Sequence, residues 1–507
     1  MTGASVPGVS SRNGSGTGTP EIAIIGAGFG GIGLGIQLRK AGIESFTILE
    51  KAGRVGGVWR DNSYPGLTCD VPSLLYQFSF EPNHDWSRRF PRRDEILAYI
   101  ERCADKYGLN DHIRLGTEVA RADFDEDAGR WRVGLVGGEE IGADVLVTAM
   151  GQLSRPSYPR IPGLDGFEGE LFHSARWNHD YDLTGKRVAA IGTGASAIQY
   201  IPEIAPVVGR LDVYQRTPNW TVAKADRPYR QREKALFRRF PWIPALSRRL
   251  TYTRFELFTL GMTRAPWILK LHERDHKRRV EREVPDPELR AKLIPDYPLG
   301  CKRVLVTSDW LPALARPNVH VITEDVAAVT PSGVRTAGGA ERPADAIILG
   351  TGFQTNDFLA PMDVRGLGGR DLNDAWHDGA DAYLGLAVSG FPNMFMLYGP
   401  NTNLGAGSII TMLESQIGYV VEAVRELQRG RARWMDVRDD VQSAFNEEVQ
   451  RRLAGSVWTA GCNSWYRTES GKVTNNWAGF VTEYRRRTRR PDPADYRLVQ
   501  ARPKARA

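Results

Sequence analysis

Residues 22–33 read Ile-Ala-Ile-Ile-Gly-Ala-Gly-Phe-Gly-Gly-Ile-Gly, an apolar run followed directly by a glycine-rich turn. Four consecutive apolar residues at 22–25 predict a buried parallel strand, and a helix is expected to begin in the turn. Gly26 permits the tight turn, Gly28 lets the backbone approach a pyrophosphate, and Gly31 allows the helix to pack closely on the strand. The positive end of that helix then faces the phosphate charge. The stretch therefore predicts a dinucleotide-binding site.

The residues after this turn complete the same unit. A second strand is predicted at 46–49, and it ends at Glu50, 24 residues after Gly26. A carboxylate at this distance accepts hydrogen bonds from ribose hydroxyls. A glycine-rich turn alone is a weak signal, whereas strand, turn, helix and spaced acid together are specific. This site is expected to hold FAD.

A second unit of this kind begins at residue 188. The strand 188–191 leads into Gly-Thr-Gly-Ala-Ser-Ala, which supplies Gly192, Gly194 and, as the allowed small third residue, Ala197. Ser196 can hydrogen-bond the phosphate. The sequence therefore predicts a second dinucleotide site.

The second strand of this unit indicates which nicotinamide binds. The strand 211–214 ends in Gln215-Arg216-Thr217, so the position of the acid in the first unit is neutral and is followed by a cation. Arginine there suits the 2′-phosphate of NADP and disfavours NAD. A surface salt bridge is the alternative role for Arg216. The second site is thus expected to bind NADPH.

Two such sites in one chain predict an α/β protein with two Rossmann-like dinucleotide-binding domains, for FAD and NADP, and electron transfer between them. Residues 228–300 are arginine-rich and aromatic, lack glycine-rich turns, and predict a helical insertion in the NADP domain. They could form a substrate vestibule, rest on a membrane surface, or simply pack on their own sheet.

The sequence also predicts how the domains follow one another. A flexible leader (1–20) precedes the first part of the FAD domain (21–152). The NADP domain follows in two pieces (153–227 and 301–349) around the helical insertion (228–300). The second part of the FAD domain (350–484) and a basic tail (485–507) complete the chain.

Composition agrees with several packed domains. The chain has 507 residues, of which 41% are hydrophobic and 25% charged, and it exceeds the size at which one hydrophobic core stops growing. Its net charge is +7, and the segment from Arg485 to the end carries nine basic residues and two acids. Everything before that segment is neutral in sum. We therefore expect a solvated basic tail and no nucleic-acid partner, since no aromatic residues interleave the basic run.

The amino-terminal segment, the longest uncharged stretch and the cysteines bear on location and membrane insertion. The first 20 residues are rich in Gly, Ser and Thr and do not resemble a secretion signal. The uncharged stretch 382–413 contains two prolines and five glycines, which argues against a membrane-spanning helix. Four widely separated cysteines show no metal, redox or disulfide spacing. These features favour a cytoplasmic protein without metal and without stable membrane insertion.

Two motifs resemble a known family. Residues 56–70, GGVWRDNSYPGLTCD, are similar to the pattern GGxWxxxxYPGxxxD of type I Baeyer-Villiger monooxygenases, which includes Trp59 and Asp70. Residues 167–178, FEGELFHSARWN, resemble the family fingerprint FxGxxxHxxxW through Gly169, His173 and Trp177. Asn178 departs from the usual Pro or Asp. Trp177 separates the chain from related monooxygenases that oxidise nitrogen and sulfur, and the resemblance runs from about residue 20 to residue 480.

The resemblance implies roles for further residues. Cys301-Lys302-Arg303 resembles a family pair in which the lysine reaches the NADP 2′-phosphate and the arginine stands over the flavin. Asp70 would hold that guanidinium in place, and Gln152 falls where the family has a glutamine beside the active site. Residues 463–466, with Trp465, resemble a mobile loop that closes over the nicotinamide. Residues 350–353 resemble the turn that returns the chain to the FAD domain.

The chemistry explains the choice of arginine. Reduced flavin adds oxygen at C4a, and the peroxide attacks a ketone carbonyl only while deprotonated, so the site needs a cation that does not donate its proton. The pKa of arginine lies above ~12, which makes Arg303 the expected oxyanion-type stabiliser. For Asp70 the alternative role is a loop cap. His173 is expected on an interdomain linker and not in proton transfer, and Trp177 in packing.

The sequence thus predicts an NADPH- and O2-dependent FAD monooxygenase that converts a ketone to an ester or lactone. One alternative is oxygenation of sulfur or nitrogen by the same peroxyflavin kept protonated. A second is a flavin redox sensor without turnover. A helix predicted from Ile409 to Leu427 is expected to point its amino end at the flavin. The size of the ketone and the oligomeric state stay open.

Overall fold

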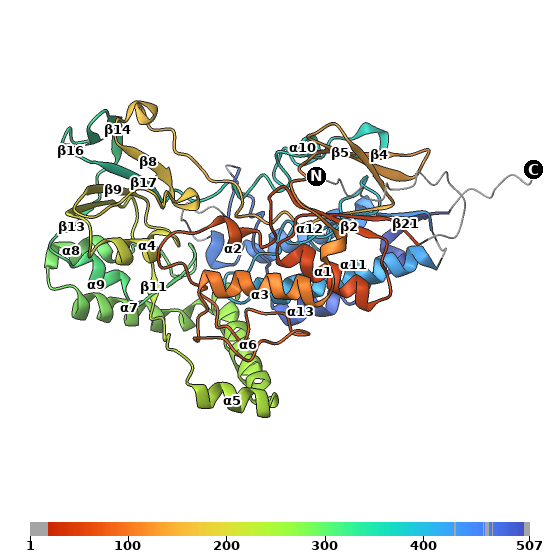
Figure 1. The fold of residues 1–507 in the computed structure, drawn as a ribbon, viewed down its shortest axis with the longest axis horizontal. Helices are drawn as coiled ribbons and strands as arrows, with labels where there is room; N and C mark the ends of the chain where they lie inside the picture. Colours follow the sequence, from red (N-terminus) through yellow and green to blue (C-terminus); the bar gives the residue numbers. More distant parts are fainter. Residues whose placement is uncertain (1–18, 430–431, 460, 462–465, 469, 501–507) are drawn as a thin grey trace, which may run out of the picture.

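A computed structural model describes residues 19–429, 432–459, 461, 466–468 and 470–500. The described chain forms two lobes, each built around a parallel sheet, with a long helical segment along one edge (Figure 1). None of the described helices combines the length and the apolar character that crossing a bilayer requires.

The sheet of the first lobe is parallel and contains the quoted stretch. Its strand order is β19-β7-β1-β2-β3, with β1 (Ile22–Ile25) in the centre and Ile22 paired with both Phe46 and Val145. All four residues of β1 are buried, as expected of a central parallel strand. The other strands are β2 (Phe46–Leu49), β3 (Ile113–Arg114), β7 (Val145–Thr148) and β19 (Met394–Met396).

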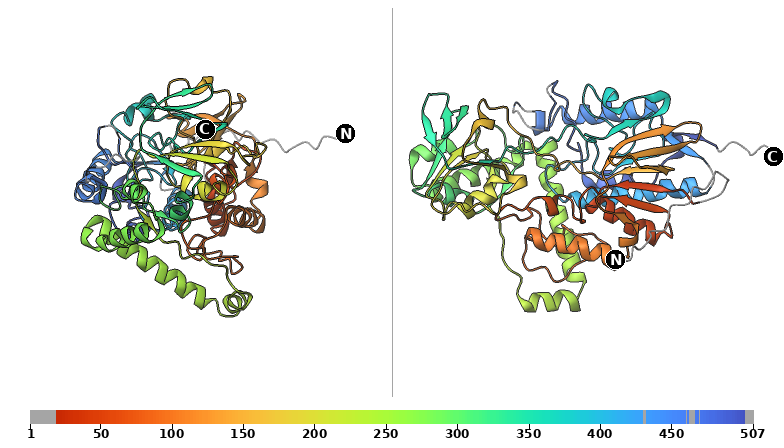
Figure 2. Two further views of the ribbon diagram at one scale, coloured as in Figure 1. Left: turned by 90° about the vertical axis from the view of Figure 1, so that its left-hand side faces the viewer. Right: turned by 45° about the horizontal axis from the view of Figure 1, so that its top comes forward.

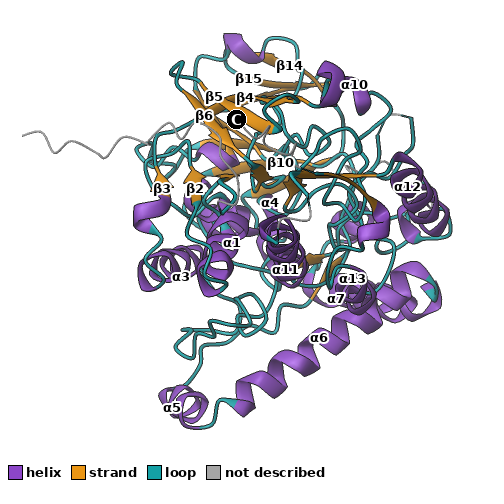
Figure 3. Cartoon of the chain, turned by 90° about the vertical axis from the view of Figure 1, so that its right-hand side faces the viewer, coloured by secondary structure: helices purple, strands orange, loops and turns teal. Residues whose placement is uncertain are grey.

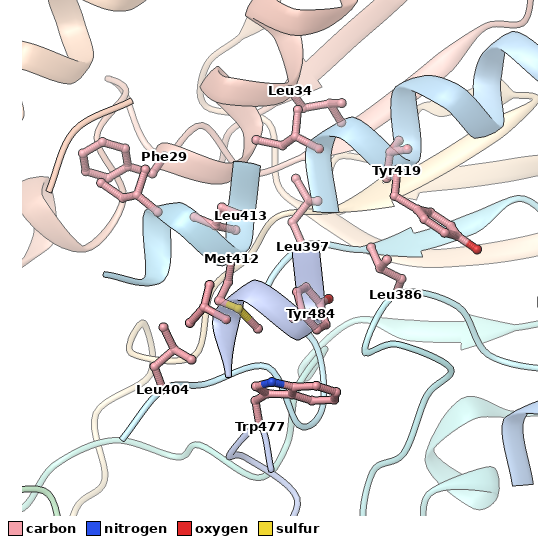
Figure 4. Packing of buried hydrophobic residues seen from close by; sticks show 14 of the residues in the cluster. Phe29, Leu34, Leu386, Leu397, Leu404, Met412, Leu413, Tyr419, Trp477 and Tyr484 are labelled. Carbon is pink, nitrogen blue, oxygen red and sulfur yellow. The ribbon is translucent and has the colours of Figure 1, made fainter. Parts of the chain in front are cut away.

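Helix α1 (Phe29–Lys40) covers this sheet together with α11 (Ile409–Gln428). The two helices approach so closely that a Cβ atom on Gly33 would lie 2.9 Å from Ile417. Figure 4 shows Leu34, Leu397, Met412 and Leu413 in the apolar layer between them. This layer fixes the amino ends of both helices at the same edge of the sheet.

The second lobe repeats the arrangement. Its parallel sheet has the order β13-β10-β9-β17-β8, and Val188 of β9 pairs with both Leu211 and Ala346. The strands are β8 (Glu170–His173), β9 (Arg187–Ile191), β10 (Arg210–Tyr214), β13 (Val319–Ile322) and β17 (Ala346–Leu349), and helices α4 (Ala197–Ile204) and α9 (Trp310–Leu314) pack together beside them. The order of strands confirms the α/β fold class with two Rossmann-like units.

Two further sheets, one mixed and one antiparallel, were not predicted. In the first lobe β18 (Asp363–Arg365), β4 (Val119–Asp125), β5 (Arg130–Leu135) and β6 (Glu140–Ala143) form one of them; in the second lobe β14 (Val326–Thr330), β15 (Gly333–Thr336) and β16 (Glu341–Pro343) form the other. The inner face of the larger sheet buries Ala122, Trp131 and Val133. Such strands bury alternate residues and give no continuous apolar run.

Residues 228–300 are helical and extend along the edge of both lobes (Figure 2). They form α5 (Gln231–Arg239), α6 (Trp242–Thr263), α7 (Lys270–Glu283) and α8 (Pro287–Leu293). The remaining helices are α2 (Val58–Asp61), α3 (Arg93–Lys106), α10 (Leu372–Ala375), α12 (Asp439–Leu453) and α13 (Val481–Arg487), and the short strands are β11 (Thr221–Val222), β12 (Leu305–Val306), β20 (Trp434–Val437) and β21 (Tyr496–Val499).

The carboxyl-terminal segment differs from the prediction of a basic tail from residue 485. Residues 485–487 end helix α13, and β21 pairs antiparallel with β20. Arg487 bonds to Glu448 at 2.7 Å and Arg497 to Asp436 at 3.1 Å. These acids lie far away in the sequence, so charge counting along the chain did not reveal that they neutralise part of the basic run.

Candidate active site between two dinucleotide-binding turns

The first glycine-rich turn lies between β1 and α1. Gly26 has a φ of +104°, and a Cβ atom there would lie 2.7 Å from the Ala149 carbonyl oxygen. A Cβ atom on Gly31 would lie 1.9 Å from the carbonyl oxygen of Gly26. At Gly28, by contrast, a Cβ atom would meet only the Cα of Gly57, at 3.7 Å. The fold thus requires Gly26 and Gly31, while Gly28 keeps space free at the amino end of α1.

Glu50 lies beside this turn at the end of β2. Its Oε2 atom accepts a hydrogen bond from the Ala27 amide at 2.9 Å, and its Oε1 atom pairs with Arg60 at 3.0 Å. The side chain is buried, and these two partners fix the carboxylate next to the turn. A carboxylate oxygen has further lone pairs, which fits a ribose hydroxyl.

Two other predicted FAD contacts are Trp59, in the short helix α2, and Gln152, in the loop after β7. Trp59 donates its indole N–H to the Tyr76 hydroxyl at 3.1 Å, which fixes its ring in the buried wall below the turn. Gln152 follows β7 and is 4% exposed, yet neither atom of its amide has a hydrogen-bond partner among the described residues. An unpaired buried amide costs free energy unless a ligand satisfies it. The first site therefore fits a bound dinucleotide.

The second turn joins β9 to α4. Gly192 has a φ of +104°, and a Cβ atom there would lie 2.4 Å from the Gly350 carbonyl oxygen, whereas nothing lies within 4 Å of a Cβ atom on Gly194. Ser196 precedes α4, and the Tyr64 ring of the first lobe lies edge-on to Tyr200 of that helix, with ring centroids 6.4 Å apart. Gly194 of the second turn thus leaves space for a ligand, as Gly28 does in the first turn, and the segment after it contacts the first lobe.

Two cations lie on one side of the second turn. Arg216 is exposed after β10, beside Thr217, and its charge acts on Lys302. Burial and the charge of Arg216 lower the pKa of Lys302, against a smaller opposite effect of Asp296. The Lys302 ammonium also lies 5.0 Å from the Tyr297 ring centroid. Two neighbouring cations fit a doubly charged phosphate.

Arg303 and Asp70 form an ion pair between the two turns. The Nη2 atom of Arg303 donates to Oδ2 of Asp70 at 2.6 Å, and the side chains are 34% and 30% exposed. Burial opposes ionisation of Asp70, but Arg303 outweighs it and lowers the carboxyl pKa. In turn Asp70 raises the pKa of Arg303 above its usual range. The pair is thus charged, and its guanidinium retains its proton.

Cys301, two residues before Arg303, corrects one expectation. Cys301 is disulfide-bonded, although the spacing of the cysteines predicted no disulfide. Cys69 and Cys103 are free and buried.

A second cation near Asp70 was missed by sequence reasoning. Lys224 follows the short strand β11, which pairs in parallel with β12, and its positive charge helps to lower the pKa of Asp70. The Lys224 ammonium donates to the Thr68 hydroxyl, and Thr68 donates its amide to Gln199 of α4 at 2.7 Å. The loop that carries Asp70 is therefore tied to the second lobe twice. Only long-range pairing unites these residues, so no local motif marks them.

The fingerprint residues lie in the second lobe and its linkers. A Cβ atom on Gly169 would lie 2.6 Å from the Asp345 carbonyl oxygen, so the chain passes close to its neighbour there. His173 is the last residue of β8, and its ring lies between those of Tyr158 and Phe353, with ring centroids 5.4 and 6.1 Å away. Its Nδ1 atom accepts a hydrogen bond from the Ala175 amide at 3.0 Å.

Burial and Arg176 lower the pKa of His173 to about 4, so the ring is neutral near pH 7. Trp177 packs edge-on against Phe172 and near Tyr200. Trp465, the predicted loop residue, lies outside the described residues.

Comparison with known proteins agrees with this geometry. A family model described as pyridine nucleotide-disulphide oxidoreductase matches residues 23–234. A Baeyer-Villiger monooxygenase of Pseudomonas aeruginosa is 48% identical over 481 residues, which are 94% of this chain and 91% of that protein. Another of that name from Streptomyces coelicolor is 47% identical over 485 residues, 95% of this chain and 93% of that protein.

Solved structures show the same relationship. An oxidized steroid monooxygenase bound to NADP superposes with a TM-score of 0.85 at 30% identity and covers 95% of this chain and 100% of its own. A closed form of cyclohexanone monooxygenase gives 0.84 at 28% identity, covering 96% of this chain and 100% of its own.

The fold and the two sites thus define an FAD-containing, NADPH-dependent monooxygenase. Within that class, the chain belongs to the type I Baeyer-Villiger monooxygenases, which convert ketones to esters or lactones with O2.

Proposed function

We propose that this chain carries out Baeyer-Villiger oxidation at the Arg303–Asp70 ion pair. The observation that carries the proposal is the 2.6 Å contact between these side chains, where Asp70 ends a loop, residues 56–70, that lies against Gly28 of the first turn and is bonded to α4 behind the second. Bound FAD, once reduced by NADPH, supplies the activated oxygen. The protein supplies binding, orientation and charge.

Arg303 acts on the oxygen atoms that become negative. Oxygen insertion next to a carbonyl places negative charge on the former ketone oxygen, and a fixed cation lowers the energy of that state. The raised pKa of Arg303 keeps the guanidinium charged throughout turnover. It therefore stabilises the charge without giving up a proton.

Asp70 and Lys224 position that cation. Asp70 takes one N–H of the guanidinium, and no other described residue accepts from it, so donors remain for ligands because arginine has five. Lys224 and Thr68 hold the loop of Asp70 against α4, the helix behind the second turn. The position of the pair thereby depends on how the two lobes meet.

Residues around the turns hold the two dinucleotides in this proposal. Gly26, Gly28, Gly31, Glu50, Trp59 and Gln152 would hold FAD, and Gly192, Gly194, Ser196, Arg216, Thr217 and Lys302 would hold NADPH. Spaces at Gly28 and Gly194 and the unpaired amide of Gln152 support this assignment. We further propose that the enzyme works in the cytoplasm, where NADPH is supplied.

Product analysis with one ketone and one sulfide tests the proposed reaction. With NADPH and air, the ketone should give an ester or lactone in step with NADPH oxidation. Sulfoxide as the main product, with no ester, would assign the chain to heteroatom oxygenation. NADPH consumption that does not respond to either substrate would contradict both.

A pair of glycine variants separates cofactor binding from folding. Gly28→Ala should fold, because its Cβ atom meets only Gly57 at 3.7 Å, but it should purify with little FAD, since it fills the approach to the pyrophosphate. Gly31→Ala should lose thermal stability, because its Cβ atom would overlap a carbonyl oxygen. Absorbance at the flavin band and the melting temperature measure the two effects. Full FAD content in Gly28→Ala would remove Gly28 from the cofactor site.

His173 is expected to act through the linkers and not as a proton donor. His173→Ala should slow NADPH oxidation and ester formation together, while FAD stays bound. Because the pKa of His173 is about 4, the ring is already neutral above about pH 5, and the pH profile should keep its shape. His173→Asn should retain more activity, since its amide oxygen can still accept from Ala175. A pH profile that loses one limb in His173→Ala would indicate proton transfer instead.

A further inference from the structure

Helices α5 and α6 form an arm at the edge of the molecule (Figures 1 and 3). Fourteen large apolar side chains are exposed in the described part of the chain, and eight of them lie between residues 236 and 271. Six belong to the arm: Leu236, Phe240, Trp242, Leu246, Leu250 and Leu257. Exposed apolar side chains are common singly, but such concentration marks an interaction surface.

The exposed residues of α6 lie on one face. At roughly 100° per residue, Trp242, Leu246, Leu250 and Leu257 fall within an arc of about 80°. Their side chains are 63%, 49%, 59% and 57% exposed. The apolar stripe they form therefore runs along most of the helix.

The opposite face of α6 already has partners. Arg248 donates to the carbonyl oxygens of Leu74, Leu75 and Gln77 at 3.2, 3.1 and 3.0 Å, and its charge lies 3.9 Å from Glu414 of α11. Phe255 packs against the core of the first lobe. The stripe is thus fixed by the fold to point away from the body.

Positive charge surrounds the stripe. Residues 230–254 contain eight basic residues and one acid, a net charge of +7, although the chain before residue 485 is neutral in sum. Arg238 pairs with Asp85. Within the described ranges no acidic side chain pairs with the other exposed arginines of α5 and α6, which are Arg232, Arg239, Arg249 and Arg254.

The arginines of α6 flank the stripe closely. On the same angular scale Arg249 lies about 20° outside one edge of the stripe and Arg254 about 40° outside the other. Long basic side chains beside an apolar face extend to headgroup phosphates while the apolar side chains enter the acyl boundary. Tryptophan, exposed here at 242, prefers that boundary.

We propose that the α5–α6 arm binds the surface of a bilayer that contains anionic lipids, with α6 lying in the plane of the interface. A second copy of this chain fits the stripe less well, because the arginines around it, Arg232, Arg239, Arg249 and Arg254, would face the same arginines of the other copy, and like charges repel. No helix needs to cross the bilayer, in agreement with the described helices. Membrane binding by the arm does not depend on which reaction the enzyme catalyses.

Co-flotation of the purified holoenzyme with vesicles tests the proposal. Phosphatidylcholine vesicles containing phosphatidylglycerol should carry the enzyme upward, and vesicles of phosphatidylcholine alone should carry much less. Raised salt should weaken binding, because each arginine near an anionic surface strengthens it roughly fivefold. Equal flotation on both vesicles would contradict the electrostatic part of the proposal.

Variants assign the binding to the arm. Trp242→Glu/Leu250→Glu and, separately, Arg249→Glu/Arg254→Glu should each weaken binding by roughly tenfold or more. Val136→Glu, which changes an apolar side chain 64% exposed on the first lobe, should bind like the wild type. All variants keep the basic carboxyl-terminal segment. Unchanged flotation in both arm variants would locate the binding elsewhere and overturn the proposal.

Sedimentation velocity tests whether a second copy of the chain covers the apolar stripe instead of a membrane. The wild-type enzyme should have a mass near the 56.4 kDa of one chain, or a larger mass that the arm substitutions do not change. A dimer that dissociates in Trp242→Glu/Leu250→Glu would show that a second copy covers the stripe, and would overturn the membrane proposal.

Discussion

Replacing Arg303 with alanine is expected to reduce ester formation by about 10²–10³-fold or more, while FAD remains bound. The glycine-rich turn and Glu50 hold that cofactor without contribution from Arg303, so flavin absorbance should match the wild type. The loss is large because Arg303 supplies a full, preorganised charge held at 2.6 Å from Asp70. Rates of ester formation and of NADPH oxidation, measured together, check the expectation.

Two further variants sharpen this test. Arg303→Lys should recover little activity, because a lysine ammonium lacks the planar fork that reaches Asp70 and a ligand together, and it loses its proton more readily when buried. Arg187→Ala is the matched control. Arg187 also contacts an aspartate, Asp345, at 2.6 Å, but it lies at the end of β9 that is remote from the second glycine-rich turn. Equal loss in Arg187→Ala would show general damage and not a catalytic effect.

Preference for NADPH over NADH is expected to fall about ten- to a hundredfold in Arg216→Ala and again in Lys302→Ala. Each charge-assisted contact contributes roughly 1.5–3 kcal/mol, which corresponds to that range. The two cations lie close enough for Arg216 to lower the pKa of Lys302. The KM for NADPH should therefore rise, and kcat should change less.

The KM for NADH is the internal control for this experiment, because NADH lacks the 2′-phosphate and should be affected little. A charge-preserving change, Lys302→Arg, should retain part of the preference. If the ratio of kcat/KM for the two coenzymes stays unchanged in both alanine variants, the phosphate-binding cations lie elsewhere in the chain.

Local motifs predicted the two turns well. Gly26, Gly31 and Gly192 are needed because of close backbone contacts within one strand–turn–helix unit, and such contacts leave a short pattern in the sequence. The predicted helix at 409–427 is α11, which ends one residue later. The sheets of β18-β4-β5-β6 and β14-β15-β16 were missed, because their strands lack long apolar runs.

Contacts between distant segments were harder to predict. The ion pair of Arg303 with Asp70 joins residues 233 positions apart, and only the family resemblance suggested it. Lys224, Thr68 and Gln199 come from three separate segments and meet only through hydrogen bonds, which no periodicity reveals. The carboxyl-terminal arginines were taken for a tail because the acids that pair with them, such as Glu448, belong to other elements.

Labelling with ¹⁸O2 tests most directly the claim that this enzyme inserts oxygen beside a carbonyl at the Arg303–Asp70 pair. The wild-type holoenzyme and Arg303→Ala, matched for FAD content, are incubated with NADPH and one ketone under ¹⁸O2, and the products are analysed by mass spectrometry. We expect one ¹⁸O atom in each ester molecule from the wild type and only background ester from Arg303→Ala. Unlabelled ester from the wild type, or labelled ester from Arg303→Ala in wild-type yield, would contradict the account.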